Sequence, residues 1–322
     1  MPSRTDLIST DVELAAERIR RGGLVAIPTE TVYGLAGDAE NADAVARIFE
    51  VKGRPTDHPL IVHVADADQL HGWVARVTDE ITALAEACWP GPLTILAERG
   101  PRVLDAVTGG RPAVAVRVPS HPMTNELLTR VGGGLAAPSA NRFGRVSPTR
   151  AEHVLADLPG LQPGRDLILD GGACPVGVES TIVDLTVDPP QVLRSGAIDA
   201  ADIERLLDTP VSGAAGPSRA SGMLASHYAP TATVILAQDA GAAEIAAGDL
   251  RHGGRRVEVL DRTGDLVVAA RELYNDLRAA DREGLDALVV VLPPAAGIGH
   301  ALRDRLMKAA AQPGPDHPSR GG

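Results

Sequence analysis

Polar side chains follow directly on a short apolar run near the start of the sequence. Residues 24–27 (LVAI) are apolar, a proline ends the run, and Thr29, Glu30, Thr31 and Tyr33 come next. Open α/β sheets place their ligands at the carboxyl ends of strands, so these groups could face a pocket. For two threonines alone, the capping of a turn is the more common reason for such a pattern. This stretch by itself leaves both interpretations open.

Two cations lie on the connection that follows the helical pattern 42–49. Lys52 and Arg54 stand in a segment with glycine and proline that leads into the next apolar run. Paired cations on such a connection suit a polyphosphate, although a solvated loop would have the same composition. The chain has lysine only at positions 52 and 308 and otherwise uses arginine. Lys52 therefore indicates a need for a compact ammonium group.

An arginine interrupts another apolar run. Arg117 stands in residues 113–118 (AVAVRV), where the other side chains are apolar. A buried arginine normally needs a carboxylate or a phosphate as partner. A substrate contact and a structural ion pair are equally open here.

Two further loops carry small hydroxyls at strand ends. The loop after a proline at position 138 holds Ser139, Asn141 and Ser147, and such side chains with exposed backbone amides can wrap phosphate oxygens. Ser180 opens the apolar run 180–186 behind a glycine-rich loop, which lacks the lysine of a Walker A motif. Each loop alone is a weak signal.

Alternating strand and helix patterns predict the elements that position these residues. Apolar runs predict strands at 24–27, 60–64, 93–98, 113–118, 167–170, 180–186 and 191–194. Amphipathic spacing predicts helices at 11–21, 42–49, 79–87 and 200–207. Residues 1–207 are therefore expected to form an α/β domain around a twisted mixed sheet.

The pattern changes after residue 207. Residues 208–230 are rich in glycine, serine, proline and alanine without periodicity, which predicts a linker or lid. Residues 231–312 are expected to form a smaller, Rossmann-like α/β domain, and residues 313–322 a disordered tail. The strands of this smaller domain are predicted at 232–237, 255–260 and 285–292, and its helices at 265–280 and 299–311.

Composition narrows the class of protein. The chain of 322 residues is 44% hydrophobic, has a formal charge of −11 and contains only 2% aromatic residues, which argues against stable nucleic-acid binding. Its two cysteines are far apart, so neither a disulfide framework nor a structural zinc site is expected. No run is long enough to cross a membrane and the first residues do not form a signal peptide, which predicts a cytoplasmic protein without membrane contact.

Seven stretches in one order resemble a known family. They are PTETVYGL, KGRPTDHPLIVH, WPGPLT, AVRVPSHP, APSANRFGRVSPT, ESTIVDL and VLRSGAI. This set resembles the YrdC-like threonylcarbamoyl-adenylate synthases, and the linker and C-terminal part resemble the two-domain branch of that family. The resemblance covers Leu14 to about Ala310. It implies an enzyme that condenses L-threonine, bicarbonate or carbon dioxide, and ATP into L-threonylcarbamoyl-AMP with release of pyrophosphate. The product would feed a tRNA threonylcarbamoyl-transfer complex that modifies the adenosine next to the anticodon.

The resemblance also implies roles for individual residues. Threonine would be held by Thr31, His63, Arg117 and Ser180. ATP would be bound by Lys52, Arg54, His58, Ser139, Asn141, Ser147, Arg194 and Tyr228, of which Lys52, Arg54, Ser139 and Asn141 would act in catalysis. The cofactor would be Mg²⁺ held mainly by the ATP phosphates, with no metal ligand assigned to the protein.

The sequence departs from the family pattern at three positions, two in these stretches and one in the predicted linker. His58 stands where the family commonly has asparagine, which leaves one nucleotide contact open. Ser195 and Ser221 replace prolines, and serine does not restrict φ as proline does. A more flexible linker than in relatives is the expected consequence.

Three other classes of function compete with this interpretation. A double-stranded RNA-binding module is disfavoured by the negative charge. A hydrogenase-type carbamoyl-transfer maturation factor would carry zinc-finger cysteine pairs, and this chain has two cysteines in all. A regulatory nucleotide-binding protein that catalyses no reaction can be distinguished from an enzyme only by an activity assay.

Overall fold

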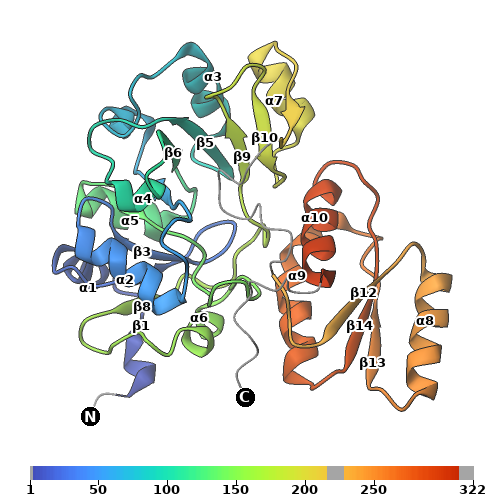
Figure 1. Cartoon of the computed structure of the whole chain (residues 1–322). Coiled ribbons are helices and arrows are strands. Elements are labelled where there is room, and N and C mark those ends of the chain that lie inside the picture. Colours follow the sequence, from blue (N-terminus) through green and yellow to red (C-terminus); the bar gives the residue numbers. More distant parts are fainter. Residues whose placement is uncertain (1–2, 216–227, 312–322) are drawn as a thin grey trace. The chain divides into compact units, whose positions relative to one another are not determined.

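The apolar runs of the sequence form strands, and helices pack on these strands in two separate units (Figure 1). The computed structural model describes residues 3–215 and 228–311. The first unit comprises residues 3–143 and 147–215, and the second comprises residues 144–146 and 228–311. Ser221 and the predicted tail lie outside the described residues.

The first unit contains one mixed sheet with helices on both faces. Its strands are β1 (Ile8–Ser9), β2 (Val25–Ile27), β3 (Gly34–Asp38), β4 (Ile61–His63), β5 (Leu93–Glu98), β6 (Ala113–Arg117), β7 (Leu135–Ala136), β8 (Leu167–Leu169), β9 (Thr181–Asp184), β10 (Gln191–Arg194) and β11 (Ser212–Gly213). Its α-helices are α1 (Val12–Arg20), α2 (Ala42–Lys52), α3 (Asp79–Cys88), α4 (Asp105–Thr108), α5 (Pro122–Val131), α6 (Ala151–Asp157) and α7 (Ala200–Leu207), and two 3₁₀ turns cover Arg4–Leu7 and Ala67–Leu70.

The strand order brings together segments that are far apart in the sequence. It runs β1-β8-β2-β3-β7-β4-β6-β5-β9-β10-β11. The neighbours β4 and β6 are parallel with His63 opposite Arg117, and β5 and β9 are parallel with Leu93 opposite Thr181. The strand β5 also pairs antiparallel with β6. Predicted site residues thus occupy the ends of adjacent strands in the middle of the sheet.

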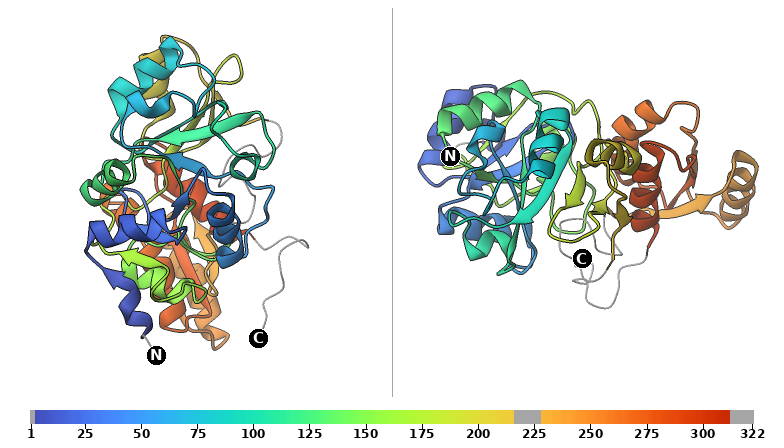
Figure 2. Two further views of the ribbon diagram at one scale, coloured as in Figure 1. Left: turned by 90° about the vertical axis from the view of Figure 1, so that its left-hand side faces the viewer. Right: turned by 90° about the horizontal axis from the view of Figure 1, so that it is seen from above.

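Burial on both faces explains why the strand runs are continuously apolar. In β2, Val25 and Ile27 face the core beneath α1 and α5, whereas Ala26 faces the core on the other side. The helices α1 and α5 lie side by side on the face of the sheet to which Val25 and Ile27 point (Figure 2).

A buried ion pair fixes the start of two strands. Asp166 is almost fully buried before β8, and its carboxylate accepts both terminal nitrogens of Arg47 in α2 at 3.0 and 2.9 Å. The same carboxylate accepts the amide of Leu24, just before β2, at 2.9 Å. Asp166 therefore links α2 to β2 and β8 through charge-assisted hydrogen bonds.

The helix α2 extends beyond its predicted end. The sequence pattern ends the helix at Phe49, but the structure continues it to Lys52. Gly53 then ends it with a φ of 60°, a left-handed conformation that favours glycine. Lys52 is accordingly a buried helical residue and does not lie on the following loop.

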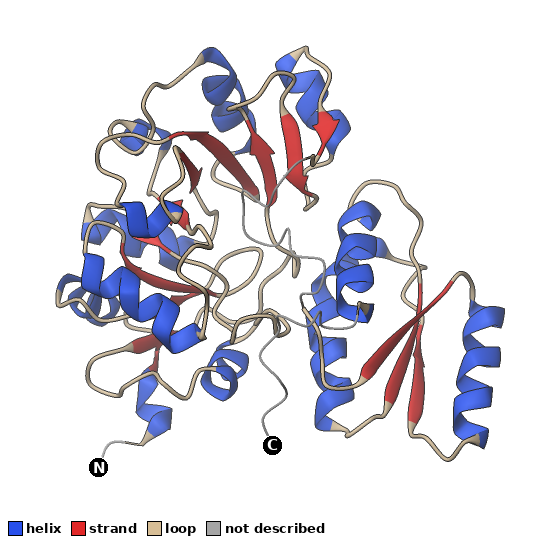
Figure 3. Cartoon of the chain, viewed as in Figure 1, coloured by secondary structure: helices blue, strands red, loops and turns tan. Residues whose placement is uncertain are grey.

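The second unit is a small three-layer α/β fold. Its elements are β12 (Thr233–Ala237), α8 (Ala240–His252), β13 (Val257–Leu260), α9 (Leu266–Arg282), β14 (Ala287–Val291) and α10 (Gly299–Ala310). The sheet has the order β12-β14-β13 and is parallel throughout. Figure 3 shows its strands between α8 and the pair α9 and α10. The predicted fold class, a mixed-sheet domain followed by a smaller α/β domain, is confirmed.

Part of the predicted linker has regular structure. Ser212 and Gly213 form β11, which pairs in parallel with the start of β10. Ala229 belongs to the second unit, where its amide donates to the Gly144 carbonyl at 3.2 Å. The domain boundaries at 207 and 230 stay a prediction.

Across the described residues, every helix is too short or too polar to cross a membrane.

Candidate active site

The loop between β2 and β3 carries the two threonines of the PTETVYGL stretch. The Thr29 hydroxyl donates to the Val32 carbonyl at 2.6 Å and accepts the amides of Thr31 and Val32, each at 3.1 Å. This hydroxyl has a single proton, so Thr31 is the donor in the 2.8 Å contact between the two hydroxyls. Thr29 caps the turn, whereas the Thr31 oxygen can accept another donor.

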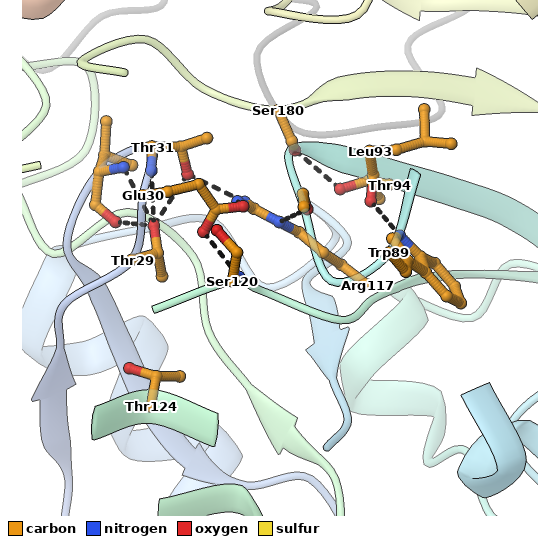
Figure 4. A network of polar contacts seen from close by, with 12 residues as sticks. Thr29, Glu30, Thr31, Trp89, Leu93, Thr94, Arg117, Ser120, Thr124 and Ser180 are labelled. Atoms are coloured by element: carbon orange, nitrogen blue, oxygen red, sulfur yellow. Dashed lines mark hydrogen bonds and ion pairs between the residues drawn. The ribbon is translucent and has the colours of Figure 1, made fainter. Parts of the chain in front are cut away.

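That donor is Arg117, at the end of β6. Its Nη1 donates to Thr31 Oγ1 at 3.0 Å, its Nη2 to Glu30 Oε1 at 2.7 Å, and its Nε to the Gly91 carbonyl at 3.1 Å (Figure 4). The Arg117 side chain is only 4% exposed. Burial raises the pKa of the Glu30 carboxyl, but the charge and hydrogen bond of Arg117, together with backbone hydrogen bonds, lower it more, so the pKa lies below its ordinary value. Glu30 is therefore a carboxylate at physiological pH.

His63 lies beside Arg117 at the end of β4. Burial, and then the positive charge of Arg117, lower the pKa of His63 to about 3. The ring is therefore neutral at physiological pH. Its Nδ1 is buried and has no hydrogen-bond partner among residues 3–215 and 228–311. A buried polar atom of this kind is expected to meet a ligand or a water molecule.

The His63 shift predicts that acid destabilises the fold. Well above pH 6.5 the His63 ring is neutral in both the folded and the unfolded chain. Below pH 6.5 the ring becomes protonated in the unfolded chain but stays neutral in the folded chain down to about pH 3. Between about pH 6.5 and about pH 5 this costs about 2 kcal/mol of unfolding free energy. Urea unfolding at about pH 7 and about pH 5 should show that the unaltered chain loses this much more stability than His63→Asn. Equal losses in both proteins would contradict the prediction.

Ser180 forms a second polar cluster at the start of β9. Its hydroxyl contacts Thr94 Oγ1 at 2.7 Å and accepts Arg194 Nη2 at 2.9 Å. Arg194 Nε also donates to the Ser180 carbonyl at 2.9 Å. Arg194 is thus fixed next to a residue assigned to threonine.

Lys52 and the loop after β7 form a third group. The Lys52 ammonium donates to the carbonyls of Ser139 and Asn141, both at 2.5 Å, and the Lys52 carbonyl accepts the Phe143 amide at 2.9 Å. Burial, and then the charge of Arg54, lower the pKa of Lys52. The structure therefore brings together three of the four residues predicted to act in catalysis.

Arg54 and His58 meet on an aromatic ring. The Arg54 guanidinium carbon lies 5.6 Å from the centre of the Phe143 ring, and the His58 ring meets the same ring edge-on at 5.3 Å. Arg54 Nη2 also donates to the Pro59 carbonyl at 3.0 Å. Burial, and then the charge of Arg54, lower the pKa of His58. His58 thus lies next to Arg54, and the nucleotide contact of both residues stays a prediction.

Ser147 contacts a carboxylate that precedes Ser180. The Ser147 hydroxyl donates to Glu179 Oε1 at 2.6 Å, and both side chains are buried. This hydrogen bond joins the loop after β7 to the loop before β9.

Backbone hydrogen bonds connect these clusters. The Tyr33 amide donates to the Pro148 carbonyl at 2.8 Å, and the Tyr33 carbonyl accepts the Ala140 amide at 2.7 Å. The Glu30 carbonyl accepts the Val176 amide at 2.8 Å. The loop with the two threonines therefore lies between the Arg117 network and the loop after β7, whose carbonyls accept the Lys52 ammonium.

Tyr228 lies in the second unit. It is buried, has a φ of 62°, and stacks on Tyr274 with 5.6 Å between the ring centres. The Arg305 guanidinium carbon lies 5.2 Å from its ring centre. The expectation that Tyr228 contacts the nucleotide stays a prediction.

Five residues of these clusters were not among the predicted site residues: Thr29, Glu30, Thr94, Phe143 and Glu179. Thr29 and Glu30 belong to the polar stretch after the apolar run 24–27, and Glu179 directly precedes Ser180, so their positions were a usable signal. Thr94 is a polar residue within the otherwise apolar run of β5. Phe143 has no comparable signal in the sequence.

The chain is similar to known proteins over most of its length. Residues 17–196 match the family model described as "Telomere recombination", and residues 198–311 match the model of the threonylcarbamoyl-AMP synthase C-terminal domain. A threonylcarbamoyl-AMP synthase from Bacillus subtilis is 38% identical over 95% of this chain and 95% of its own length. One from Pyrococcus abyssi is 39% identical over 93% of this chain and 94% of its own length.

The structure of the Pyrococcus abyssi protein Sua5 in complex with L-threonine is also similar. It has a TM-score of 0.87 and 38% identity, and the match covers 93% of this chain and 94% of that one. These matches span both units. The chain belongs to the family of two-domain threonylcarbamoyl-AMP synthases and is a nucleotidyltransferase of that family.

Proposed function

We propose that the Arg117 network holds L-threonine and that the group around Lys52 holds ATP, so that the site makes threonylcarbamoyl-AMP. The observation that carries this proposal is the state of the Arg117 guanidinium. It has five N–H groups, and three have the partners given above. Within residues 3–215 and 228–311, this leaves one N–H on each terminal nitrogen for a ligand. Two such groups form the fork that binds a carboxylate through both oxygens.

The remaining threonine contacts come from neutral groups. The buried Nδ1 of neutral His63 offers a hydrogen bond to the amino acid, and Thr31 orients Arg117. A neutral imidazole beside Arg117 adds no second positive charge at the carboxylate position. This pattern supports an amino-acid substrate with its carboxylate at Arg117.

In the proposed reaction, bonds form and break between the substrates, and the protein binds and orients them. The threonine amine adds to carbon dioxide, a C–N bond forms, and the amine loses a proton to give a carbamate. A carbamate oxygen then attacks the α-phosphorus in line, and the bond to pyrophosphate breaks. Lys52 and Arg54 offset the charge that develops on pyrophosphate. Holding the two substrates in this geometry supplies much of the rate enhancement.

ATP would enter as its Mg²⁺ complex. The two carboxylates described at the site, Glu30 and Glu179, already accept hydrogen bonds from Arg117 and Ser147. Phosphate oxygens and water are therefore the proposed ligands of the ion, which prefers such oxygen donors. The product would pass to a tRNA threonylcarbamoyl-transfer complex.

Direct detection of the product tests the proposal. The full chain is incubated with ATP, Mg²⁺, bicarbonate and threonine, and the mixture is analysed at once by mass spectrometry. We expect threonylcarbamoyl-AMP together with an equal amount of pyrophosphate, and neither when threonine or bicarbonate is left out. Folded protein that releases pyrophosphate without forming the adduct, or forms neither, would contradict the proposal.

A further inference from the structure

We propose that Glu30 is a positioning residue of the threonine subsite, because it holds the Arg117 guanidinium in the orientation that receives the substrate carboxylate. This inference rests on the proposed function, which gives Arg117 its ligand. It assigns to Glu30 an effect on threonine alone, through Arg117, and no contact with ATP.

Both oxygens of Glu30 are engaged in the structure. Oε1 accepts Arg117 Nη2 at 2.7 Å, and Oε2 accepts the Ser120 amide at 3.1 Å (Figure 4). The side chains of Glu30 and Arg117 are 7% and 4% exposed. The carboxylate therefore links the guanidinium at the end of β6 to the backbone three residues later, on the connection to α5.

The backbone of Glu30 is fixed as well. Its carbonyl accepts the Val176 amide, and the neighbouring Thr31 accepts Arg117 Nη1. Three contacts thus hold three different nitrogens of the guanidinium, and Glu30 provides the only charged one among them. With Nη2 held on one side and Nη1 on the other, the planar guanidinium cannot turn about its Cδ–Nε bond, and the remaining N–H on each terminal nitrogen keeps its direction.

Electrostatics alone would predict the opposite effect of Glu30. Its negative charge offsets part of the Arg117 charge, so it weakens the attraction for a substrate carboxylate. Glu30 helps threonine bind only if orientation outweighs this loss of charge. In a buried site that receives a planar, two-oxygen ligand, a misdirected guanidinium forfeits one of two charge-assisted hydrogen bonds. The sign of the change in KM therefore separates the two effects.

Glu30→Gln and Glu30→Ala measure that sign. A glutamine amide has one acceptor oxygen and can serve Arg117 or Ser120 but not both, whereas alanine serves neither. We expect the KM for threonine to rise about tenfold in Glu30→Gln and more in Glu30→Ala, with the KM for ATP changed less than about twofold. Equilibrium binding of threonine to the full chain without ATP should weaken by the same factor.

Asp166→Asn is the matched control. Asp166 is also a buried carboxylate that pairs with an arginine, Arg47, and accepts backbone amides, but it lies outside the clusters of the site. We expect this variant to lower the stability of the fold and to leave both KM values unchanged. It therefore reports what the loss of a buried ion pair does without a role in positioning.

The outcomes distinguish this inference from the proposed function. A threonine KM that stays constant or falls in Glu30→Gln, while Arg117→Lys raises it, overturns the inference about Glu30 alone. A parallel rise in the KM for ATP also overturns it, because it indicates general damage to the site. An Arg117→Lys effect confined to ATP would instead contradict the assignment of Arg117 to threonine. If Glu30→Ala does not fold, the Glu30→Gln result and its threonine binding decide the question.

Discussion

Replacing Arg117 with lysine is expected to raise the KM for threonine about 30- to 100-fold, which corresponds to about 2–3 kcal/mol of binding energy. Lysine keeps the positive charge but has no planar fork, so it cannot bind both oxygens of a carboxylate. It also cannot reach Gly91, Thr31 and Glu30 together, as Arg117 does. Steady-state pyrophosphate release with threonine and ATP varied in turn measures the effect, and the KM for ATP should change less than about threefold.

Arg102→Lys is a suitable control for this substitution. Arg102 also forms a two-point ion pair, with Glu40, but it lies at the surface on the Trp73 ring. The same chemical change there should leave both KM values as they are. A rise that appears only in the KM for ATP would show that Arg117 serves the other substrate.

Periodicity was sufficient to predict most elements of the fold. The runs at 24–27 and 93–98 are strands because they are buried on both faces, and the amphipathic spacing of 11–21 forms a helix from Val12 to Arg20. The helix α8 had no such signal, because its sequence AGAAEIAAGDLRH is rich in alanine and lacks a clear apolar stripe. Alanine favours a helix without marking which face is buried.

The end of α2 shows where a local pattern misleads. The residues after Phe49 are Glu50, Val51 and Lys52, which resemble a polar connection. Two contacts that no local pattern encodes, with Ser139 and Asn141, allow the ammonium to be buried in the last turn. Gly53 was the usable signal, since a glycine just beyond a helix commonly ends it.

The partner of Arg117 also escaped prediction from the sequence. An arginine within an apolar run indicates a buried counter-ion, but not which of many carboxylates provides it. Glu30 lies 87 residues away, and only the order of β2, β6 and their loops places the two side chains in contact. The sequence therefore indicated that Arg117 needs a buried partner, whereas the identity of that partner depends on the sheet.

Replacing Lys52 with methionine is expected to reduce kcat/KM for ATP by about 1,000-fold, or about 4 kcal/mol. Methionine has a similar length but no charge, so it removes the cation that would face the phosphates. It also leaves the carbonyls of Ser139 and Asn141 without their donor, and an unsatisfied buried acceptor costs about 1–3 kcal/mol. Unlike a residue on a solvated loop, Lys52 should therefore affect the stability of the fold as well as the reaction, and urea unfolding should detect this loss.

Lys308→Met provides the matched control, because Lys308 is the other lysine of the chain. It lies in α10 of the second unit, with its ammonium 2.8 Å from Asp304, so the same substitution should leave pyrophosphate release unchanged.

An ammonium has three N–H donors, and the two carbonyls take two of those of Lys52, which leaves one for a phosphate oxygen. That geometry makes Lys52 the brace of the loop after β7 and leaves it able to serve as the proposed contact for ATP. A Lys52→Met protein that unfolds at lower urea but releases pyrophosphate within about fivefold of the normal rate would show that only the bracing role is real.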